Sequence, residues 1–406
     1  MTTHAEQMHA SEAMVRCPVM ATYAAPQVMF VRGEGSCLFD PDGKRYLDFL
    51  GGLAVTSLGH AHPTIALAIA EQARTLLHVS NLFGTEHQAG VAKTLDALIA
   101  GAAAPRGQVF FANSGAEANE CAIKLARKWG GRGKHVVVSA GRSFHGRTLA
   151  TLHATGQPEK HEPFQPLPEG FRHAGFNDLD DFARVLDESV AALLLETVQG
   201  EGGVNPGDPA FFQGLRRICD ERGILMMIDE VQTGLGRTGQ WFGFQHMGIE
   251  PDVVTMAKSL GNGMPIGACW AKAEVAAAFK PGDHGSTYGG QPLATAAARA
   301  VLQVMQSIDA PTLASERGAL ITEKLKTLDG VTRVRGLGLL LGIEIDPEVL
   351  DGRLAKDVAS QCLDAGLVLN GITNTALRIA PAFIVTDAEI DEAIGILAAV
   401  LAGGSA

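Results

Sequence analysis

No hydrophobic run in the sequence approaches the length of a membrane-spanning segment, so a membrane partner is not expected. Residues 1–20 lack a basic stretch followed by a long apolar stretch, so no secretory signal is predicted. Positive charge is also scarce, since 33 Lys and Arg stand against 44 Asp and Glu, a net charge of −11. A protein with this balance repels phosphate backbones, so nucleic-acid binding is not expected either.

Cysteine is sparse, with six residues scattered along the chain and none in a CxxC pair. A chain of 406 residues needs no disulfide staples to fold. The cysteines are expected to be reduced and buried, as is typical of a cytoplasmic protein. Neither cysteines nor an acidic cluster accompany His60 and His62, so we expect a turn with hydrogen-bonded histidines there and no metal. The six cysteines are Cys17, Cys37, Cys121, Cys219, Cys269 and Cys362.

Glycine, in contrast, is abundant, with 48 residues that cluster in short loops between apolar runs. Each run is short enough for a strand that is buried on both faces. Helical patterns such as Ala116–Trp129 and Phe211–Arg222 lie between several of them. This alternation predicts an α/β fold with a mostly parallel sheet covered by helices. The runs are Val109–Ala112, Val136–Ser139, Ala191–Leu195, Ile224–Ile228, Val253–Met256 and Ile266–Ala271.

The chain is too long for one simple core, so two domains are expected. Residues 28–49 alternate apolar and turn residues, which predicts short strands and a hairpin. From about residue 301 a long helical stretch is followed by mixed helices and strands. We predict that residues 59–305 form the large domain. Residues 306–406 would form a smaller α+β domain, which the N-terminal segment 1–58 joins.

The tetrapeptide from Ser114 to Glu117 follows a predicted strand and opens a predicted amphipathic helix. Its two end residues have the spacing of a capping box, so a well-capped helix accounts for it without any ligand. The alternative is an anion site, because Gly115 lets the backbone approach closely and the N–H groups of a first helical turn attract phosphate. This segment alone leaves both interpretations open.

Two charged residues follow predicted strands. Asp229 comes after the run that ends at Ile228, and Lys258 comes shortly after Met256. In α/β sheets, ligands bind at the carboxyl ends of the strands. A buried lysine is a nucleophile that can form an imine, and a buried carboxylate needs a cationic partner. The simpler alternatives to a ligand site are a surface turn at Asp229 and a side chain of Lys258 that extends into solvent.

The segment Gly234–Gly239 (GLGRTG) matches the GxGxxG pattern of dinucleotide-binding loops. In such loops the glycines open a helix. Here the residues Gln240–Phe244 (QWFGF) follow, which we interpret as an aromatic loop. A nicotinamide enzyme is therefore the less favoured hypothesis.

Together, Lys258, Asp229 and the helix start at Gly115 supply the parts that pyridoxal 5′-phosphate needs. These are an imine-forming amine, an acid for the ring nitrogen and a phosphate site. Phe144 could stack on a flat ring, and Arg147 could bind a carboxylate. The sequence therefore predicts an enzyme with this cofactor.

Longer segments resemble the class III aminotransferases, over nearly the whole chain from about residue 22. The resemblance implies a fold type I pyridoxal-phosphate-dependent transferase, and a homodimer whose active sites lie at the subunit interface. The segments are 30–63, SGAEAN (114–119), SFHGRT (143–148), QGEGG (199–203), IDEVQTGLGRTG (228–239), AKSLGNGMPIGA (257–268), GSTYGGQPLA (285–294) and LRIAPAF (377–383).

The resemblance also implies roles for individual residues. Lys258 would bind the cofactor covalently and Asp229 would pair with its ring nitrogen, as the two catalytic residues. Glu201 would pair with Arg378 and release it for a dicarboxylate substrate. The other cofactor contacts would come from Ser114, Gly115, Ala116, Phe144, Val231 and Gln232, and from Thr287 of the partner subunit. The substrate contacts would come from Arg147, Glu201, Ser286 and Arg378.

The reaction expected from this resemblance moves the δ-amino group of N2-acetylornithine to 2-oxoglutarate, a step of arginine biosynthesis. Ornithine, succinylornithine, 4-aminobutyrate and a lysine-pathway amine remain open as donors, because a methylene or acyl difference changes binding by only about 1–3 kcal/mol. Racemisation at a similar cofactor site and a non-catalytic pyridoxal-binding sensor are the remaining alternatives. Asn262 and Met264 depart from the residues that relatives often have, and this change could affect substrate preference.

Overall fold

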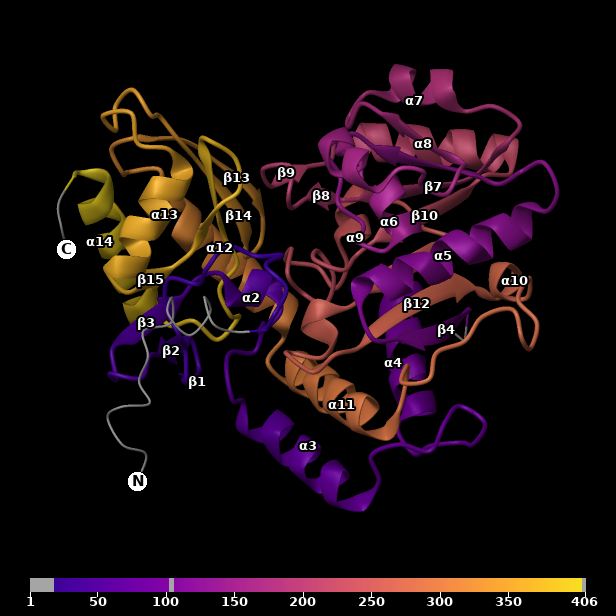
Figure 1. Ribbon diagram of the computed structural model, residues 1–406, viewed down its shortest axis with the longest axis horizontal. Coiled ribbons are helices and arrows are strands. Elements are labelled where there is room, and N and C mark those ends of the chain that lie inside the picture. Colours follow the sequence, from indigo (N-terminus) through magenta and orange to yellow (C-terminus); the bar gives the residue numbers. More distant parts are fainter. Residues whose placement is uncertain (1–17, 102–105, 404–406) are drawn as a thin grey trace.

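The computed structural model describes residues 18–101 and 106–403 and shows an α/β protein built around a seven-stranded sheet (Figure 1). Residues 1–17, which include Cys17, lie outside the described residues. Six of the seven strands correspond to the predicted apolar runs, which confirms the predicted fold class. In spatial order they are β4 (Gly107–Ala112), β12 (Gly267–Lys272), β11 (Val253–Met256), β10 (Leu225–Asp229), β7 (Val190–Glu196), β5 (Val136–Ala140) and β6 (Phe171–Ala174).

One strand of this sheet, β12, runs against the others. It pairs antiparallel with β11 and β4, whereas β10 pairs parallel with β7 and β11, and β5 pairs parallel with β6 and β7. The sheet is therefore mostly parallel, as predicted. The carboxyl ends of β7, β10 and β11 meet at one edge, where ligands bind in open α/β sheets.

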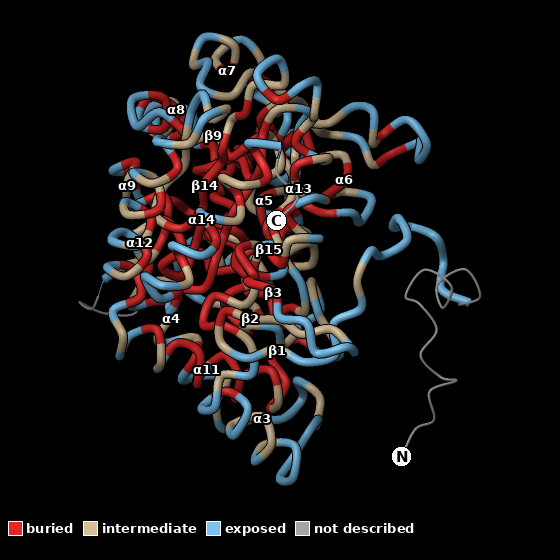
Figure 2. The backbone as a smooth tube through the Cα atoms, turned by 90° about the vertical axis from the view of Figure 1, so that its left-hand side faces the viewer, coloured by how far each residue is buried: buried red, intermediate tan, exposed pale blue. Residues whose placement is uncertain are grey.

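Successive residues of the buried strands face two separate layers of helices. In β7, Leu193 and Leu195 belong to one hydrophobic cluster, and Ala192 and Leu194 belong to the other. This follows from the two-residue repeat of a strand. Figure 2 shows the buried residues running through the middle of the molecule, with exposed residues on its outer loops and helices. The first layer includes α4 (Gln88–Ala100), α8 (Pro209–Arg222), α9 (Gly243–Met247) and α11 (Pro292–Ser307), and the second includes α5 (Gly115–Gly130), α6 (Leu149–Ala154) and α10 (Ala273–Ala276).

Two smaller sheets lie beside this core on the left of Figure 1. In one of them β15, from the C-terminal part, pairs parallel with β3. This pairing brings β3 together with the C-terminal part, and the predicted division of the chain at residues 58 and 305 stays a prediction. The first sheet contains β1 (Arg32–Glu34), β2 (Cys37–Phe39), β3 (Arg45–Asp48) and β15 (Leu367–Val368). The second contains β13 (Val331–Leu337), β14 (Leu340–Ile345), β17 (Ala376–Ile379) and β16 (Asn370–Gly371), near the helices α12 (Ala310–Leu325), α13 (Ala355–Asp364) and α14 (Asp387–Leu401).

The remaining elements connect these parts. They are α2 (Gly51–Ala54), α3 (Pro63–Thr75), α7 (Leu179–Val185), β8 (Val198–Gln199), β9 (Asn205–Pro206) and the 3₁₀ turns Pro158–Lys160, Glu162–Phe164 and η4 (Lys258–Leu260). Within the described ranges, no helix is both long and apolar enough to cross a membrane. The five described cysteines are free thiols, and all but the half-buried Cys37 are buried, which largely confirms the expectation for them.

Candidate active site

A cavity of about 640 Å³ lies at the carboxyl ends of β7, β10 and β11. Its size is typical of a small-molecule site. Ten of the thirteen predicted site residues line it, so the structure brings most of the prediction into one place. They are Ser114, Gly115, Ala116, Phe144, Arg147, Glu201, Asp229, Val231, Gln232 and Lys258.

The start of α5 forms one wall of the cavity. Ser114 Oγ accepts a hydrogen bond from the backbone N–H of Glu117 (3.2 Å), which confirms the predicted helix cap. The predicted capping box is incomplete, because Glu117 Oε2 accepts instead from the backbone N–H of Asn113 (2.7 Å) and from its side chain. A Cβ at Gly115 would lie 2.8 Å from Val231 Cγ1, so glycine is what lets the helix start approach Val231 this closely. The backbone N–H groups of this first turn can bind an anion.

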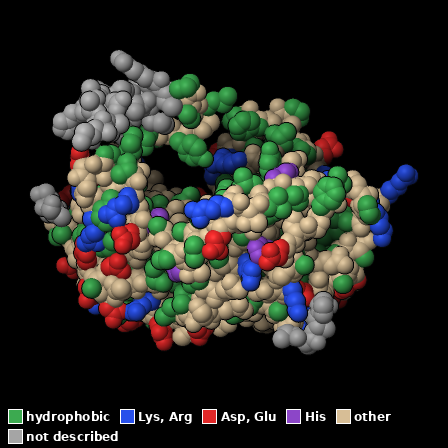
Figure 3. Space-filling view, turned by 90° about the horizontal axis from the view of Figure 1, so that it is seen from below, with side chains coloured by type: hydrophobic (Ala, Val, Ile, Leu, Met, Phe, Trp, Pro, Cys, Tyr) green, Lys and Arg blue, Asp and Glu red, His purple; other side chains and the backbone are tan. Residues whose placement is uncertain are grey.

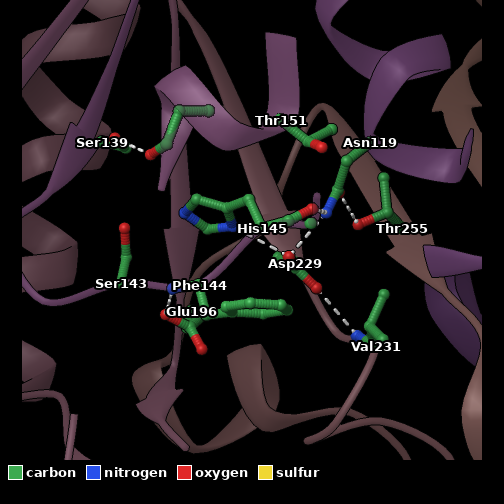
Figure 4. Close-up of polar contacts among 12 residues, drawn as sticks. Asn119, Ser139, Ser143, Phe144, His145, Thr151, Glu196, Asp229, Val231 and Thr255 are labelled. Carbon is green, nitrogen blue, oxygen red and sulfur yellow. Dashed lines mark hydrogen bonds and ion pairs between the residues drawn. The ribbon is translucent and has the colours of Figure 1, made fainter. Parts of the chain in front are cut away.

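Asp229, the last residue of β10, is buried and held on three sides (Figure 4). Its Oδ2 accepts a hydrogen bond from Asn119 Nδ2 (2.8 Å) and lies 2.8 Å from His145 Nδ1. Its Oδ1 accepts from the backbone N–H of Val231 (3.0 Å). These contacts fix the carboxylate at the cavity wall.

Lys258 follows β11 and begins η4 with a backbone φ of 43°, in the left-handed region that non-glycine residues rarely adopt. Its position inside the protein, together with the charge of Arg378, lowers the pKa of its amine to about 8, against the opposing effect of Asp229 and two glutamates. A lowered pKa leaves more of the amine uncharged near neutral pH, as a nucleophile requires.

Glu196 is a cavity-lining carboxyl group that was not predicted from the sequence. It ends β7 and is the cross-strand neighbour of Asp229. Its Oε2 accepts a hydrogen bond from the backbone N–H of Phe144 (3.1 Å), and burial raises its pKa to about 7. The signal that identified Asp229, a carboxylate directly after an apolar run, also applied to this residue. Asn119 and His145 were also missed as partners of Asp229, although both lie in segments that carry the family resemblance.

Arg378, on β17, does not line the cavity but is linked to it by Glu201. The Arg378 guanidinium is buried, and its Nη1 donates to Glu201 Oε1 at 2.8 Å. Burial alone would raise the pKa of Glu201, but the charge and hydrogen bond of Arg378 hold it below its ordinary value. The Glu201 carboxylate is 36% exposed, against 1% for Arg378, so it is the more accessible partner of the pair.

Arg147 and Phe144 lie on the loop before α6. Arg147 is exposed at the cavity wall, and its guanidinium carbon lies 5.5 Å from the centroid of the Phe144 ring. Gln232, which also lines the cavity, donates weakly from its Nε2 to the carbonyl oxygen of Leu53 (3.4 Å). Leu53, Val55 and Tyr23 also line the cavity and bring the N-terminal part of the chain to it.

Two predicted residues, Ser286 and Thr287, are not among those that line this cavity. Thr287 is exposed, and Ser286 is half-buried with its Oγ 3.2 Å from Asn113 Nδ2. Neither lines the cavity of its own chain, so their predicted contribution to a partner's site stays a prediction.

Two other predictions concern segments outside the cavity. The GLGRTG segment forms turns and opens no helix, whereas the glycines of a dinucleotide-binding loop open one. The interpretation of Gln240–Phe244 as a loop is partly wrong, because the short helix α9 begins at Gly243.

His60 Nε2 lies 2.7 Å from Asp48 Oδ2, a hydrogen-bonded histidine as predicted. Among the described residues, no group of three or more metal-ligating side chains comes together.

The cavity residues fit pyridoxal 5′-phosphate. A reactive amine, a fixed carboxylate and a helix N-terminus line the same cavity, as this cofactor requires. A Cβ at Gly146 would lie 2.8 Å from Ala116 Cβ, so the loop that carries Phe144 closes directly over the start of α5. Lys258, Asp229 and the backbone of Gly115 and Ala116 are the groups that could hold the cofactor.

Comparison with known proteins gives a consistent result. The family model described as "Aminotransferase class-III" matches residues 19–401. A relative from Gloeobacter violaceus, described as acetylornithine aminotransferase, is 50% identical over 95% of this chain and 96% of its own. A relative from Aquifex aeolicus with the same description is 45% identical over 94% of this chain and 99% of its own.

Solved structures agree with this result at lower identity. The ornithine aminotransferase from Toxoplasma gondii superposes with a TM-score of 0.91, at 30% identity, over 98% of this chain and 96% of that chain. A second structure of that enzyme, at 29% identity, is described as having partial occupancy of PLP at its active site, with a TM-score of 0.90 over 99% and 98% of the two chains.

Proposed function

Because the chain belongs to the class III aminotransferases, we propose that it moves the δ-amino group of N2-acetylornithine to 2-oxoglutarate. The products are N-acetylglutamate 5-semialdehyde and glutamate. The observation that carries the aminotransferase assignment is that Lys258 and Asp229 line one cavity. The choice of donor is supported by relatives of 42–50% identity that share one description. The cytoplasmic location expected from the cysteines stays a prediction.

Class III aminotransferases use pyridoxal 5′-phosphate, which supplies an aldehyde that accepts the amino group and a ring that withdraws electrons from the reacting carbon. In this chain, the amine of Lys258 would hold the cofactor and then take the proton from the substrate carbon that bears the amino group. The pKa of about 8 allows it to accept and release a proton near neutral pH. Asp229 would hold a proton at the ring nitrogen, since Asn119, His145 and Val231 fix its carboxylate.

One site has to accept two substrates of different charge. Arg147, exposed at the cavity wall, would bind the α-carboxylate of the donor through its planar guanidinium. Arg378 is masked by Glu201 at 2.8 Å while the donor reacts. The α-carboxylate of 2-oxoglutarate, next to the carbon that receives the amino group, would displace Glu201 and take its place beside Arg378. The pair would therefore act as a switch between the two half-reactions.

A panel of amino donors, each assayed with 2-oxoglutarate, tests the proposed substrate. We expect kcat/KM to be highest for N2-acetylornithine, followed by ornithine and 4-aminobutyrate. A higher kcat/KM for ornithine would instead indicate an ornithine aminotransferase, the activity named for the Toxoplasma gondii structure. The absence of any dicarboxylate-dependent, two-stage reaction would contradict the aminotransferase assignment itself.

Replacing Arg147 with alanine should raise the KM for N2-acetylornithine about ten- to hundredfold, because a hydrogen-bonded contact between charges is lost. The matched control is a primary amine of similar length that has no carboxylate, so its KM should not change. Initial rates over a range of donor concentrations measure both values. An equal rise for the two amines would show that Arg147 does not bind the carboxylate.

We also propose that two copies of the chain form a dimer with shared active sites. Exposed apolar side chains extend from α3 into the following loop, on the face seen in Figure 3. The His78 and Tyr288 rings lie 5.4 Å apart, and Asn81 Nδ2 donates to the carbonyl oxygens of Ser286 and Gly289, so this loop is tied to the one that carries Thr287. Large apolar patches on a soluble protein mark interfaces. The side chains are Leu67, Leu76, Leu77, Leu82, Phe83 and Tyr288.

The double variant Leu82→Asp/Phe83→Asp should sediment as a monomer at micromolar concentration and lose most of its activity. The reason is that two charges are placed on a buried apolar contact and Thr287 is withdrawn from the partner's site. Val349→Asp, at an exposed valine of the C-terminal part, is the control and should stay dimeric and active. A monomeric wild-type protein with full activity would contradict the proposal.

A further inference from the structure

Arg237 and Arg378 are the two largest fully buried side chains in the described residues, and Arg237 lies in the GLGRTG segment to which the reaction assigns no role. Its Nη1 donates to the carbonyl oxygens of Leu339 (3.1 Å) and Pro381 (2.6 Å), and its Nη2 donates to Ser57 Oγ (2.7 Å). The guanidinium carbon lies 4.7 Å from the centroid of the Phe383 ring. The partners seen here are neutral oxygens and an aromatic ring rather than a carboxylate.

A buried charge without an opposite charge is costly, so this position calls for a physical reason. Burial lowers the pKa of Arg237 to about 9, which still leaves the guanidinium charged at neutral pH. Its partners come from three separate parts of the chain. Ser57 precedes α3, Leu339 lies between β13 and β14, and Pro381 follows β17. Arg237 therefore joins the cofactor-side sheet to the N-terminal and C-terminal parts at one point.

The hydrogen bonds continue from Arg237 toward the reactive lysine. Ser57 Oγ lies 2.6 Å from Ser259 Oγ, and Ser259 Oγ donates to the carbonyl oxygen of Ala54 (3.1 Å). Arginine only donates, so the Ser57 oxygen accepts from it. Because the Ser259 proton goes to Ala54, the Ser57 proton goes to Ser259. The chain of donors therefore has one direction, from Arg237 through Ser57 and Ser259 to Ala54.

Ser259 directly follows Lys258, whose backbone is in the left-handed region. Such strained conformations persist only where the surroundings hold them. A second contact fastens the other end of this turn. Asn262 Oδ1 accepts from the backbone N–H of Leu58 (2.8 Å), and its Nδ2 donates to the carbonyl oxygen of Gly59 (3.0 Å). The lysine turn is thus attached to residues 54–59 at both ends.

We propose that Arg237, acting through Ser57 and Ser259, is a positioning residue that holds Lys258 in the conformation that directs its amine into the cavity. Arg237 touches neither the substrate nor the cofactor in this arrangement. The same guanidinium also fixes the junction between the cofactor-side sheet and the C-terminal part. Displacement of that junction would therefore be transmitted to the reactive amine. The proposal rests on the proposed function only in taking Lys258 as the reacting amine.

The experiment uses the full-length protein after removal of its cofactor. The rate at which added pyridoxal 5′-phosphate becomes lysine-bound is followed by its visible absorbance, without any substrate. Arg237→Lys, which keeps the charge but loses the fork of donors, and Ser259→Ala should each lower this rate about ten- to hundredfold, because a displacement of about 1 Å can cost that much. The kcat with the preferred donor should fall to a similar extent, with KM changing less.

A double-mutant cycle tests whether the two residues act in series. The combined variant should be no slower than the slower single variant, because both changes break the same chain of hydrogen bonds. Ser139→Ala, at another buried serine whose Oγ donates to a backbone carbonyl, is the matched control and should bind the cofactor at the wild-type rate.

Effects of Arg237→Lys and Ser259→Ala that simply add would overturn the proposal. A lowered melting temperature of both variants with cofactor attachment at the wild-type rate would also overturn it. That result would mean that Arg237 only stabilises the contact between two parts of the chain. If Arg237→Lys does not fold, Ser259→Ala still tests the proposal, because cofactor attachment at the wild-type rate in Ser259→Ala would contradict it. Attachment is measured without a donor, so failure of the proposed substrate would leave this result unchanged.

Discussion

Replacing Lys258 with alanine is expected to lower kcat by at least about 10⁴-fold, because both the covalent contact and the general base are lost. Loss of a positioned acid–base group alone typically costs about 10²–10⁴-fold. The structure adds a reason why no other lysine should take over. Lys258 is the only lysine that lines the described cavity, and its pKa is lowered to about 8 by its surroundings.

Two measurements check this prediction on the same samples. The visible absorbance of the lysine-bound cofactor should disappear, and turnover of N2-acetylornithine should fall to background. Lys272→Met is the control, since Lys272 pairs with Asp252 at 2.8 Å outside the cavity and should not affect kcat. A Lys258→Ala protein with kcat within tenfold of wild type would show that Lys258 is not the residue that binds the cofactor and moves the proton.

The second large effect is expected from Asp229→Asn, which should lower kcat by roughly 10²–10³-fold, the usual cost of removing one preplaced electrostatic group. The variant cannot hold a proton at the ring nitrogen as a carboxylate does. Its amide would also face the donating Nδ2 of Asn119, which now bonds to Asp229 Oδ2 at 2.8 Å. Cofactor attachment to Lys258 should persist, because the change lies at the other end of the ring.

The neighbouring residue offers a matched control for Asp229→Asn. Glu230 is also buried at the end of β10, but its carboxyl accepts from the backbone N–H groups of Gly243 (3.0 Å) and Phe244 (2.8 Å) instead. Burial raises the pKa of Glu230 to about 7. Glutamine there would turn an amide nitrogen toward a backbone N–H, so it shares with Asp229→Asn the disturbance of facing a donor and differs from it in lying away from the ring nitrogen. Steady-state rates should separate the two variants, with Glu230→Gln near wild type. Equal losses in both would indicate a general disturbance of this strand end.

Much of the central sheet could be predicted because its strands are buried on both faces. A short, uninterrupted apolar run such as Val253–Met256 is typical of a buried strand, and a charged residue shortly after it is easy to recognise. The same reasoning placed Asp229 and Lys258 at one edge, where the structure has them. The strand β6 was missed because its sequence, Phe-Arg-His-Ala, is half polar.

Other features could not be predicted because they depend on contacts between distant residues. An apolar run carries no information on strand direction, so the reversal of β12 was not predicted. The partners of Arg237 at Ser57, Leu339 and Pro381 lie about 100 to 180 positions away along the chain. The role of the GLGRTG segment therefore emerges only once the chain is folded.

The most direct test of the central claim is to reduce the cofactor-loaded protein with borohydride, digest it and locate the phosphopyridoxyl group by peptide mass spectrometry. The account predicts one label per chain, on Lys258, within the peptide that contains AKSLGNG. A label on any other lysine, or no stable label on a protein that turns over amines, would contradict it.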